Sequence, residues 1–204
     1  MMATTHALAG MVLVSATGLL APEYLPVTVG AAAAGGIFPD LDLYGNHRQT
    51  LHYPVLYSLG AVPLVALAAL VPTAVTVAVA AFVTSAALHS AMDALGGGLE
   101  LKPWKGTSER AVYNHYHGRW IRPRRWIRYD GAPEDVLFAV VLAAPLVVVV
   151  TGRMQTVVAG LVGLSVVYGF VRKPLVAVAE RIVERLPADV VDQIPGRFTE
   201  DIQS

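Results

Sequence analysis

The feature that most constrains this chain is a series of long apolar runs with almost no charged side chain. Crossing the ~30 Å hydrocarbon core of a bilayer takes about 20 apolar residues in a helix, with about 17 as the lower limit. Six stretches approach that length, and we predict an all-α, multi-pass integral membrane helix bundle of about six transmembrane helices. The runs are about Ala7 to Ala21, Val27 to Phe38, Val55 to Val71, Thr73 to Met92, Val136 to Thr151 and Thr156 to Val171.

The composition agrees with a membrane protein and narrows the chemistry. Only 15% of the 204 residues are charged and 55% are hydrophobic, whereas soluble domains carry roughly 25% charged residues. The formal net charge is zero, so we expect no nucleic-acid partner. The chain has no Cys, which leaves histidine and carboxylate as its only strong metal ligands.

The first two runs need separate interpretation. Met1 to His6 contains no basic residue, unlike the start of a signal peptide, so we expect the first run to be a retained helix. The second run is short, and Gly30 to Gly36 contains only Gly and Ala. Such small residues let neighbouring helices approach closely, which predicts an inner packing helix. A re-entrant segment or a buried helix of a soluble protein is the alternative.

The basic residues predict the orientation and the domain organisation. Eight of the fifteen Lys and Arg residues lie between Asp93 and Asp135, and five more follow Val171. Because basic loops stay in the cytoplasm, we predict that the long loop and the C-terminus lie on the cytoplasmic side of a multi-pass protein of the inner cell membrane. Its membrane domain covers residues 1–172 and includes a cytoplasmic aromatic and basic loop at residues 94–133, which we expect to contact membrane lipid. Residues 173–204 are predicted to form an amphipathic C-terminal tail.

This topology brings ionisable residues from four segments to the cytoplasmic face. They are predicted metal ligands or their immediate supports: His6, Asp40, Asp42, His47, His52, His89 and Asp93. Ionisable side chains near membrane spans are costly and tend to mark functional sites. We expect their cofactor to be one or two divalent transition metal ions, with Zn²⁺ as the first choice and Mn²⁺ or Fe²⁺ as alternatives.

The spacing of these residues gives further expectations. His89 and Asp93 are four residues apart and share a helix face, although a hydrogen-bonded polar helix end would look the same. Pro39 should end the second helix, after which extended backbone would turn Asp40 and Asp42 to the same side; a helix-capping turn is the alternative.

The segment from His47 to His52 should be irregular, because a helix would separate its two histidines by about 140°. Arg48 would then lie beside the site, where its planar donors suit a phosphate or carboxylate. Arg48 is thus a candidate catalytic residue, and a membrane-anchoring arginine is the alternative.

Together these motifs resemble the YdjM-type family of inner-membrane, metal-dependent hydrolases. The resemblance covers about the first half of the chain and rests on order and spacing: His6 after Thr5, Gly36 through Pro39-Asp40-Leu41-Asp42, His47-Arg48 with His52, and His89 with Asp93. It implies a multi-pass membrane hydrolase. The chain departs from the family at Leu51 and Tyr53, where the family usually has Thr and Ser beside the second loop histidine.

The predicted function is therefore a membrane-bound metal-dependent hydrolase in which a metal-activated water attacks an ester or phosphoester, including lipid-linked ones. Two alternatives remain open: an ion or proton transporter that uses the same cluster, and a non-catalytic membrane scaffold with a structural metal. A serine hydrolase is not expected, because the chain has no Gly-x-Ser-x-Gly motif. For His115 and His117, which flank Tyr116, a surface role is favoured over a metal role.

Overall fold

The computed structural model describes residues 1–191, 193 and 194, and these residues are mostly helical. The last part of the predicted tail, residues 195–204, lies outside the described residues. The coarse prediction of an all-α fold is confirmed, with one small addition of strand. The helices are α1 (Ala3–Ser15), α2 (Leu25–Ile37), α3 (Pro54–Leu70), α4 (Ala74–Met92), α5 (Pro133–Val149), α6 (Arg153–Val183) and the short α7 (Ala188–Val191).

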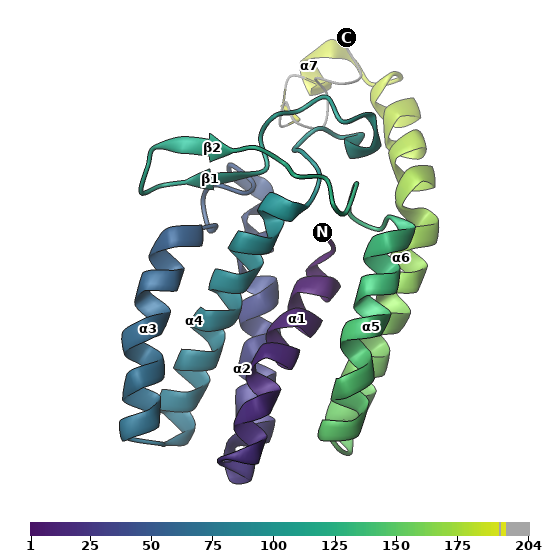
Figure 1. Ribbon diagram of the computed structural model, residues 1–204. Helices are drawn as coiled ribbons and strands as arrows, with labels where there is room; N and C mark the ends of the chain where they lie inside the picture. Colours follow the sequence, from purple (N-terminus) through teal and green to yellow (C-terminus); the bar gives the residue numbers. More distant parts are fainter. Residues whose placement is uncertain (192, 195–204) are drawn as a thin grey trace.

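The six long helices of the described chain form three hairpins that stand side by side (Figure 1). The turns within the hairpins lie at one end of the bundle, and the longer connections lie at the other. Helix α2 packs against α1 and α4, while α5 packs against α1 and α6. The core between them is apolar and includes the fully buried side chains of Leu8, Met11, Val29 and Leu146.

Small residues bring α1, α2 and α4 into close contact, as the run from Gly30 to Gly36 predicted. A Cβ atom at Gly36 would lie 2.7 Å from Ala7 Cα and from the His6 carbonyl oxygen. A Cβ at Gly35 would overlap the backbone of Phe82 in α4. The backbone of α2 therefore packs directly against the backbone of the first turn of α1, and this contact positions His6.

All six predicted apolar runs contain helices, but the helices differ in length. Among the described residues, two helical stretches are long and apolar enough to cross a membrane: Ala74–Leu95 and Arg153–Val183. Helix α3 is a shorter apolar helix. Helices α1 and α2 have 13 residues each, about 20 Å at 1.5 Å per residue. Large apolar side chains are nevertheless exposed along α3, α5 and α6, among them Val62, Val148 and Phe170.

One local prediction was wrong. The backbone after α2 is not extended, because Phe38–Tyr44 forms a 3₁₀ helix and Phe38 itself has helical dihedrals. Pro39 occupies the first turn of this helix, where its missing N–H costs nothing. The first part of the predicted tail is helical, because α6 continues through Pro174 to Val183.

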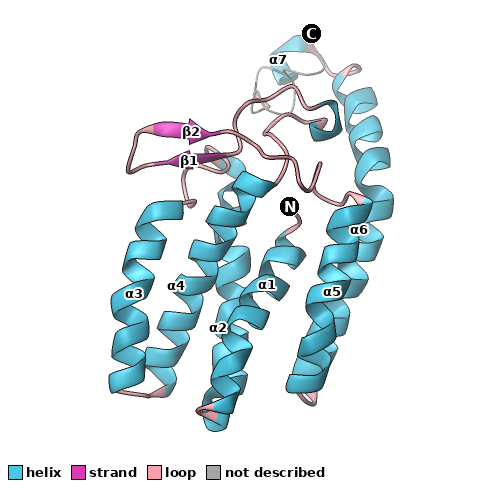
Figure 2. Ribbon diagram, in the orientation of Figure 1, coloured by secondary structure: helices cyan, strands magenta, loops and turns pink. Residues whose placement is uncertain are grey.

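The loop at residues 94–133 has a fixed path over the end of the bundle (Figure 2). It contains an unpredicted antiparallel pair of short strands, β1 (Val112–Asn114) and β2 (Arg119–Ile121). Further along, the N–H groups of Arg124 and Trp126 donate to the carbonyl oxygens of Ala94 and Leu95. The loop is therefore tied to the end of α4.

The contact of Gly36 with α1 generates a stability prediction. We expect Gly36→Ala to lower the free energy of unfolding by about 1–3 kcal/mol, because the added methyl group meets backbone that cannot rotate away. The measurement is denaturant or thermal unfolding of the detergent-solubilised protein, followed by circular dichroism.

The matched control is Gly60→Ala in α3, where an added Cβ meets nothing within 4 Å. This variant should be no less stable than the wild type. Equal stability of both variants and the wild type would contradict the close packing of α1 on α2.

Candidate metal centre

Four side chains from three chain segments converge at the loop end of the bundle. Asp40 comes from the 3₁₀ helix after α2, His52 precedes α3, and His89 and Asp93 lie at the end of α4. One nitrogen or oxygen atom of each lies within 4.8 Å of the corresponding atoms of the others. His52 Nε2 is 3.2 Å from His89 Nε2, 3.1 Å from Asp93 Oδ2 and 3.8 Å from Asp40 Oδ1. His89 Nε2 is 3.5 Å from Asp93 Oδ2 and from Asp40 Oδ1.

These separations suit the ligands of one metal ion. In a tetrahedral site with bonds of about 2.0–2.2 Å, neighbouring ligand atoms are about 3.3–3.6 Å apart. Five of the six separations are 3.1–3.8 Å and lie around this value. The sixth, between Asp40 and Asp93, is at most 4.8 Å. The group of four could therefore hold a divalent ion without a large rearrangement.

The other nitrogen of each histidine is held by a hydrogen bond. His52 Nδ1 donates to Asp42 Oδ2 at 3.0 Å, and His89 Nδ1 donates to the Gly36 carbonyl oxygen at 2.6 Å. Metal-ligating histidines usually have such an outer partner, which sets the tautomer and the ring orientation. With Nδ1 protonated in both rings, both neutral Nε2 atoms would be acceptors. Two acceptors that face each other at 3.2 Å repel unless one of the rings is protonated or a metal ion lies between them.

Asp42 supports His52 from behind. It also accepts a hydrogen bond from His47 Nδ1 at 2.7 Å and one from the Leu51 N–H at 3.3 Å. Burial alone would raise the pKa of Asp42, but the hydrogen bonds from the two histidines hold this pKa below its usual range. Burial alone would lower the pKa of His52, but the carboxylates of Asp42 and Asp93 raise it. The carboxylates thus favour positive charge at His52.

Two further predicted residues hold Asp93. His6 Nε2 donates to Asp93 Oδ1 at 3.2 Å, and the His6 ring stacks on the His89 ring with 3.7 Å between centroids. Arg48 Nε lies 3.6 Å from Asp93 Oδ2. His6 and Arg48 therefore fix the carboxylate from two sides without belonging to the group of four.

The segment from His47 to His52 is irregular, as predicted. Arg48 has a left-handed backbone conformation with φ of 58°, and its carbonyl oxygen accepts from the Tyr113 N–H in β1 at 2.9 Å. Its Nη1 donates to the carbonyl oxygens of Gly97 at 2.8 Å and Ala111 at 3.3 Å. The loop at residues 94–133 thereby positions Arg48 over the cluster.

The structure brings all seven predicted metal-site residues into one region and separates their roles. Four could ligate one ion, whereas His6, Asp42 and His47 form the surrounding hydrogen-bond network. Asp40 and Asp42 do not face the same point, because the 3₁₀ turn places them on different sides of His52.

The two loop histidines lie outside the group of four. His115 Nε2 donates to the Gln49 carbonyl oxygen at 2.7 Å and its ring stacks on Tyr53. His117 Nδ1 accepts from Asn114 at 2.9 Å. His115 therefore helps to hold the segment from His47 to His52, which contains Arg48, in place.

Sequence reasoning missed Asp135, a fully buried carboxylate at the start of α5. It accepts hydrogen bonds from Met2 N–H at 2.8 Å, Thr5 Oγ1 at 2.7 Å and Gly131 N–H at 3.1 Å. These bonds tie the start of α5 to the first turn of α1, beside His6. Its signal in the sequence was an acidic residue at the edge of an apolar run.

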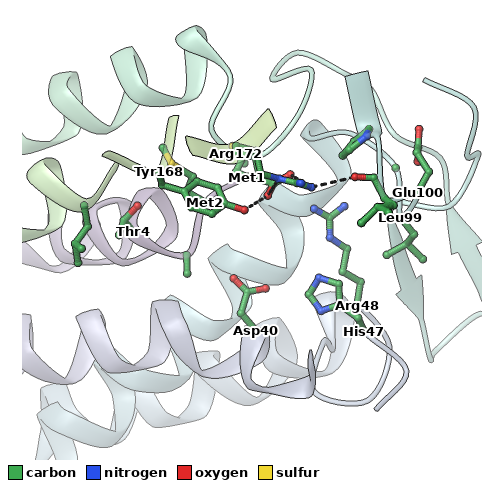
Figure 3. A pocket seen from close by; sticks show the side chains of 16 residues that line it. Met1, Met2, Thr4, Asp40, His47, Arg48, Leu99, Glu100, Tyr168 and Arg172 are labelled. Carbon is green, nitrogen blue, oxygen red and sulfur yellow. Dashed lines mark hydrogen bonds and ion pairs between the residues drawn. The ribbon is translucent and has the colours of Figure 1, made fainter. Parts of the chain in front are cut away.

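A cavity of about 530 Å³ adjoins the cluster (Figure 3). Asp40, His47 and Arg48 line one side, and Tyr168 and Arg172 of α6 line the other. The side chain of Asp40 is 21% exposed, whereas those of His52, His89 and Asp93 are at most 1% exposed. The cluster therefore opens toward the cavity at Asp40.

Comparison with protein-family models, with curated proteins and with solved structures finds no match to this chain. The resemblance to the YdjM-type hydrolases accordingly stays a prediction.

The support of His52 by Asp42 can be tested through metal affinity. Asp42→Asn replaces one carboxylate oxygen by an NH₂ group, which cannot accept from both histidines and the Leu51 N–H. We expect metal affinity to fall by about 10–100-fold, as for other outer partners of ligating histidines. The measurement is competition for Zn²⁺ between the purified protein and a chromogenic chelator.

The control is Glu109→Gln, which removes an exposed carboxylate from the loop. Its affinity should equal that of the wild type. An unchanged affinity in Asp42→Asn would show that His52 is not oriented through Asp42.

Proposed function

We propose that this protein is a membrane-bound metal-dependent hydrolase that uses a single divalent ion to cleave an ester or phosphoester. One observation carries the proposal: His52 Nε2 and His89 Nε2 face each other at 3.2 Å, and the carboxylates of Asp40 and Asp93 lie beside them. A mixed set of imidazole and carboxylate ligands suits Zn²⁺, with Mn²⁺ and Fe²⁺ as alternatives.

A metal at this point would supply the nucleophile, since a zinc-bound water has a pKa of about 7. The ligands differ in access, and this difference favours catalysis over a purely structural role. His52, His89 and Asp93 are buried, whereas Asp40 borders the cavity. Water and substrate would approach on the Asp40 side. We assign Asp40 as the ligand nearest the reaction and as the carboxylate that takes a proton from the attacking water.

Arg48 has a role in charge stabilisation. Its Nε approaches Asp93 and its Nη1 is held by two carbonyl oxygens, so the guanidinium is fixed beside the cavity. Fixed donors of this kind stabilise negative charge that develops on the substrate oxygen, and each is worth about 10²–10³ in rate.

We further propose that the six long helices form a membrane bundle with the metal site at its cytoplasmic end. Exposed apolar side chains on α3, α5 and α6 support this placement, because a contiguous apolar surface needs lipid or a partner to cover it. The basic loop at residues 94–133 lies at the same end as the cluster, where the positive-inside rule predicts the cytoplasm.

The proposed topology predicts the sides on which two threonines are accessible. Because the chain has no Cys, single cysteines can be labelled without background. In sealed, right-side-out vesicles a membrane-impermeant maleimide should label Thr151→Cys, at the turn between α5 and α6, and leave Thr107→Cys in the loop unlabelled. Permeabilised vesicles serve as the control, in which both should react. Labelling of both variants from the same side would contradict a membrane-spanning bundle.

The proposed metal chemistry predicts different results for two ligands. We expect about one equivalent of metal by plasma mass spectrometry in the wild type and none in His89→Ala, which loses a buried ligand. Asp40→Asn should retain part of the metal but lose at least about 100-fold in hydrolysis, because its amide cannot take a proton. Hydrolysis is measured with p-nitrophenyl phosphate, bis(p-nitrophenyl) phosphate and p-nitrophenyl acetate.

The matched control is His117→Ala, which should keep both metal and activity because His117 lies away from the cluster. A wild type that takes up no metal after reloading would overturn the proposal. Stoichiometric metal without hydrolysis of any of the three esters would instead support the scaffold with a structural metal.

A further inference from the structure

Two arginines from opposite walls of the cavity point toward each other beside Asp40 (Figure 3). Arg48 belongs to the loop between α2 and α3, and Arg172 belongs to α6. In the sequence, Arg172 is one of the five basic residues after Val171 that predict the orientation. In the structure it lines the cavity.

Arg172 is held in place by neighbouring groups. Its Nε donates to Asp130 Oδ2 at 2.7 Å, and its Nη2 donates to Asp130 Oδ1 at 3.2 Å and to the Leu101 carbonyl oxygen at 3.3 Å. Tyr168 Oη donates to Asp130 Oδ2 at 2.5 Å. Asp130 therefore orients the guanidinium and is itself fixed by Tyr168.

Both arginines keep hydrogen-bond donors for a ligand. Among the described residues, Arg172 Nη1 and Arg48 Nη2 have no hydrogen-bond partner, because the contacts of each side chain use its other two nitrogens. Both guanidinium groups border the same cavity, and a bound anion between them would interact favourably with both charges. Their planar donors match the oxygens of a phosphate.

The rest of the cavity lining is mixed. Met2, Leu99, Leu101 and Leu164 are apolar, whereas Glu100 and Asp130 are acidic. Leu164 is 61% exposed on α6. The cavity volume of about 530 Å³ lies within the range of roughly 300–1,000 Å³ that small-molecule sites occupy. A ligand with a phosphate at one end and an apolar group at the other would match both parts of the lining.

We propose that this cavity binds a phosphate monoester of an apolar alcohol, with its phosphate between Arg48 and Arg172 and next to Asp40. The proposal rests on the proposed hydrolase function and deepens it by naming the substrate class. In the reaction, the oxygen of water forms a bond to phosphorus and the bond from phosphorus to the alcohol oxygen breaks. Asp40 takes one proton from the water and returns it to the leaving alkoxide, so that the products are the alcohol and inorganic phosphate.

Binding is tested on metal-free protein, so that the result does not depend on metal or turnover. Isothermal titration in detergent uses decyl phosphate as the probe, with inorganic phosphate and decanol as partial probes. We expect decyl phosphate to bind more tightly than either partial probe. Arg172→Gln should weaken decyl phosphate binding by at least about 10-fold, because it removes a charged donor, while the metal content after reloading stays at the wild-type level.

The control is Arg153→Gln, which removes an exposed arginine from the other end of α6 and should bind decyl phosphate as the wild type does. A second measurement avoids substitution: decyl phosphate should protect Arg48 and Arg172 of the wild type from phenylglyoxal, as mapped by mass spectrometry. Protection of neither arginine, or unchanged binding in folded Arg172→Gln, would overturn the proposal, whatever the metal and hydrolysis experiments give.

The same titration with nanodiscs distinguishes the source of the ligand. Phosphatidic acid in phosphatidylcholine nanodiscs should bind more tightly than phosphatidylcholine alone if the ligand is a membrane lipid. If only decyl phosphate in solution binds, the site takes a soluble phosphate ester and the substrate class is retained. If inorganic phosphate binds as tightly as decyl phosphate, the apolar part of the proposal is wrong.

Discussion

The close approach of His52 Nε2 to His89 Nε2 is the constraint on which the rest of the site depends. Both rings are oriented by hydrogen bonds through Nδ1, so neither can turn away from the other without losing a buried partner. Asp40 and Asp93 place negative charge beside the two rings, so the group of four could hold a metal ion. The remaining residues of the site hold these four groups in place.

The packing of the helices also positions the residues of the cluster. Gly36 meets the backbone of α1 beside His6, and its carbonyl oxygen accepts the hydrogen bond from His89 Nδ1 in α4. Gly36 therefore sets the distance between α1 and α2, and it also orients His89 on α4. A larger side chain at this position would push α1, which carries His6, away from α2. The run of small residues therefore also positions the residues of the candidate site.

The sequence predicted the helical class, the gathering of ionisable residues at one end, the shared face of His89 and Asp93, and the irregular segment around Arg48. These features follow from local spacing and from the order of the apolar runs. The different positions of Asp40 and Asp42 relative to His52 could not be predicted, because they depend on the 3₁₀ helix Phe38–Tyr44. The sequence had predicted extended backbone after Phe38. The roles of Asp135 and Arg172 depend on partners that are 133 and 42 residues away along the chain, and no local pattern specifies such pairings.

The cluster has different surroundings on its two sides. Directly inside the bundle lie the fully buried apolar side chains of Leu8, Met11 and Val29, together with the buried hydroxyls of Thr28 and Ser85. A proton or cation route would need ionisable groups at this depth, whereas the buried ionisable side chains of the described residues lie at the loop end. On the other side, the cluster meets a cavity through Asp40, with Arg48 and Arg172 beside it. An ion held here would be reached through the cavity on the Asp40 side, which agrees with the proposed reaction of a substrate that enters and leaves at the loop end.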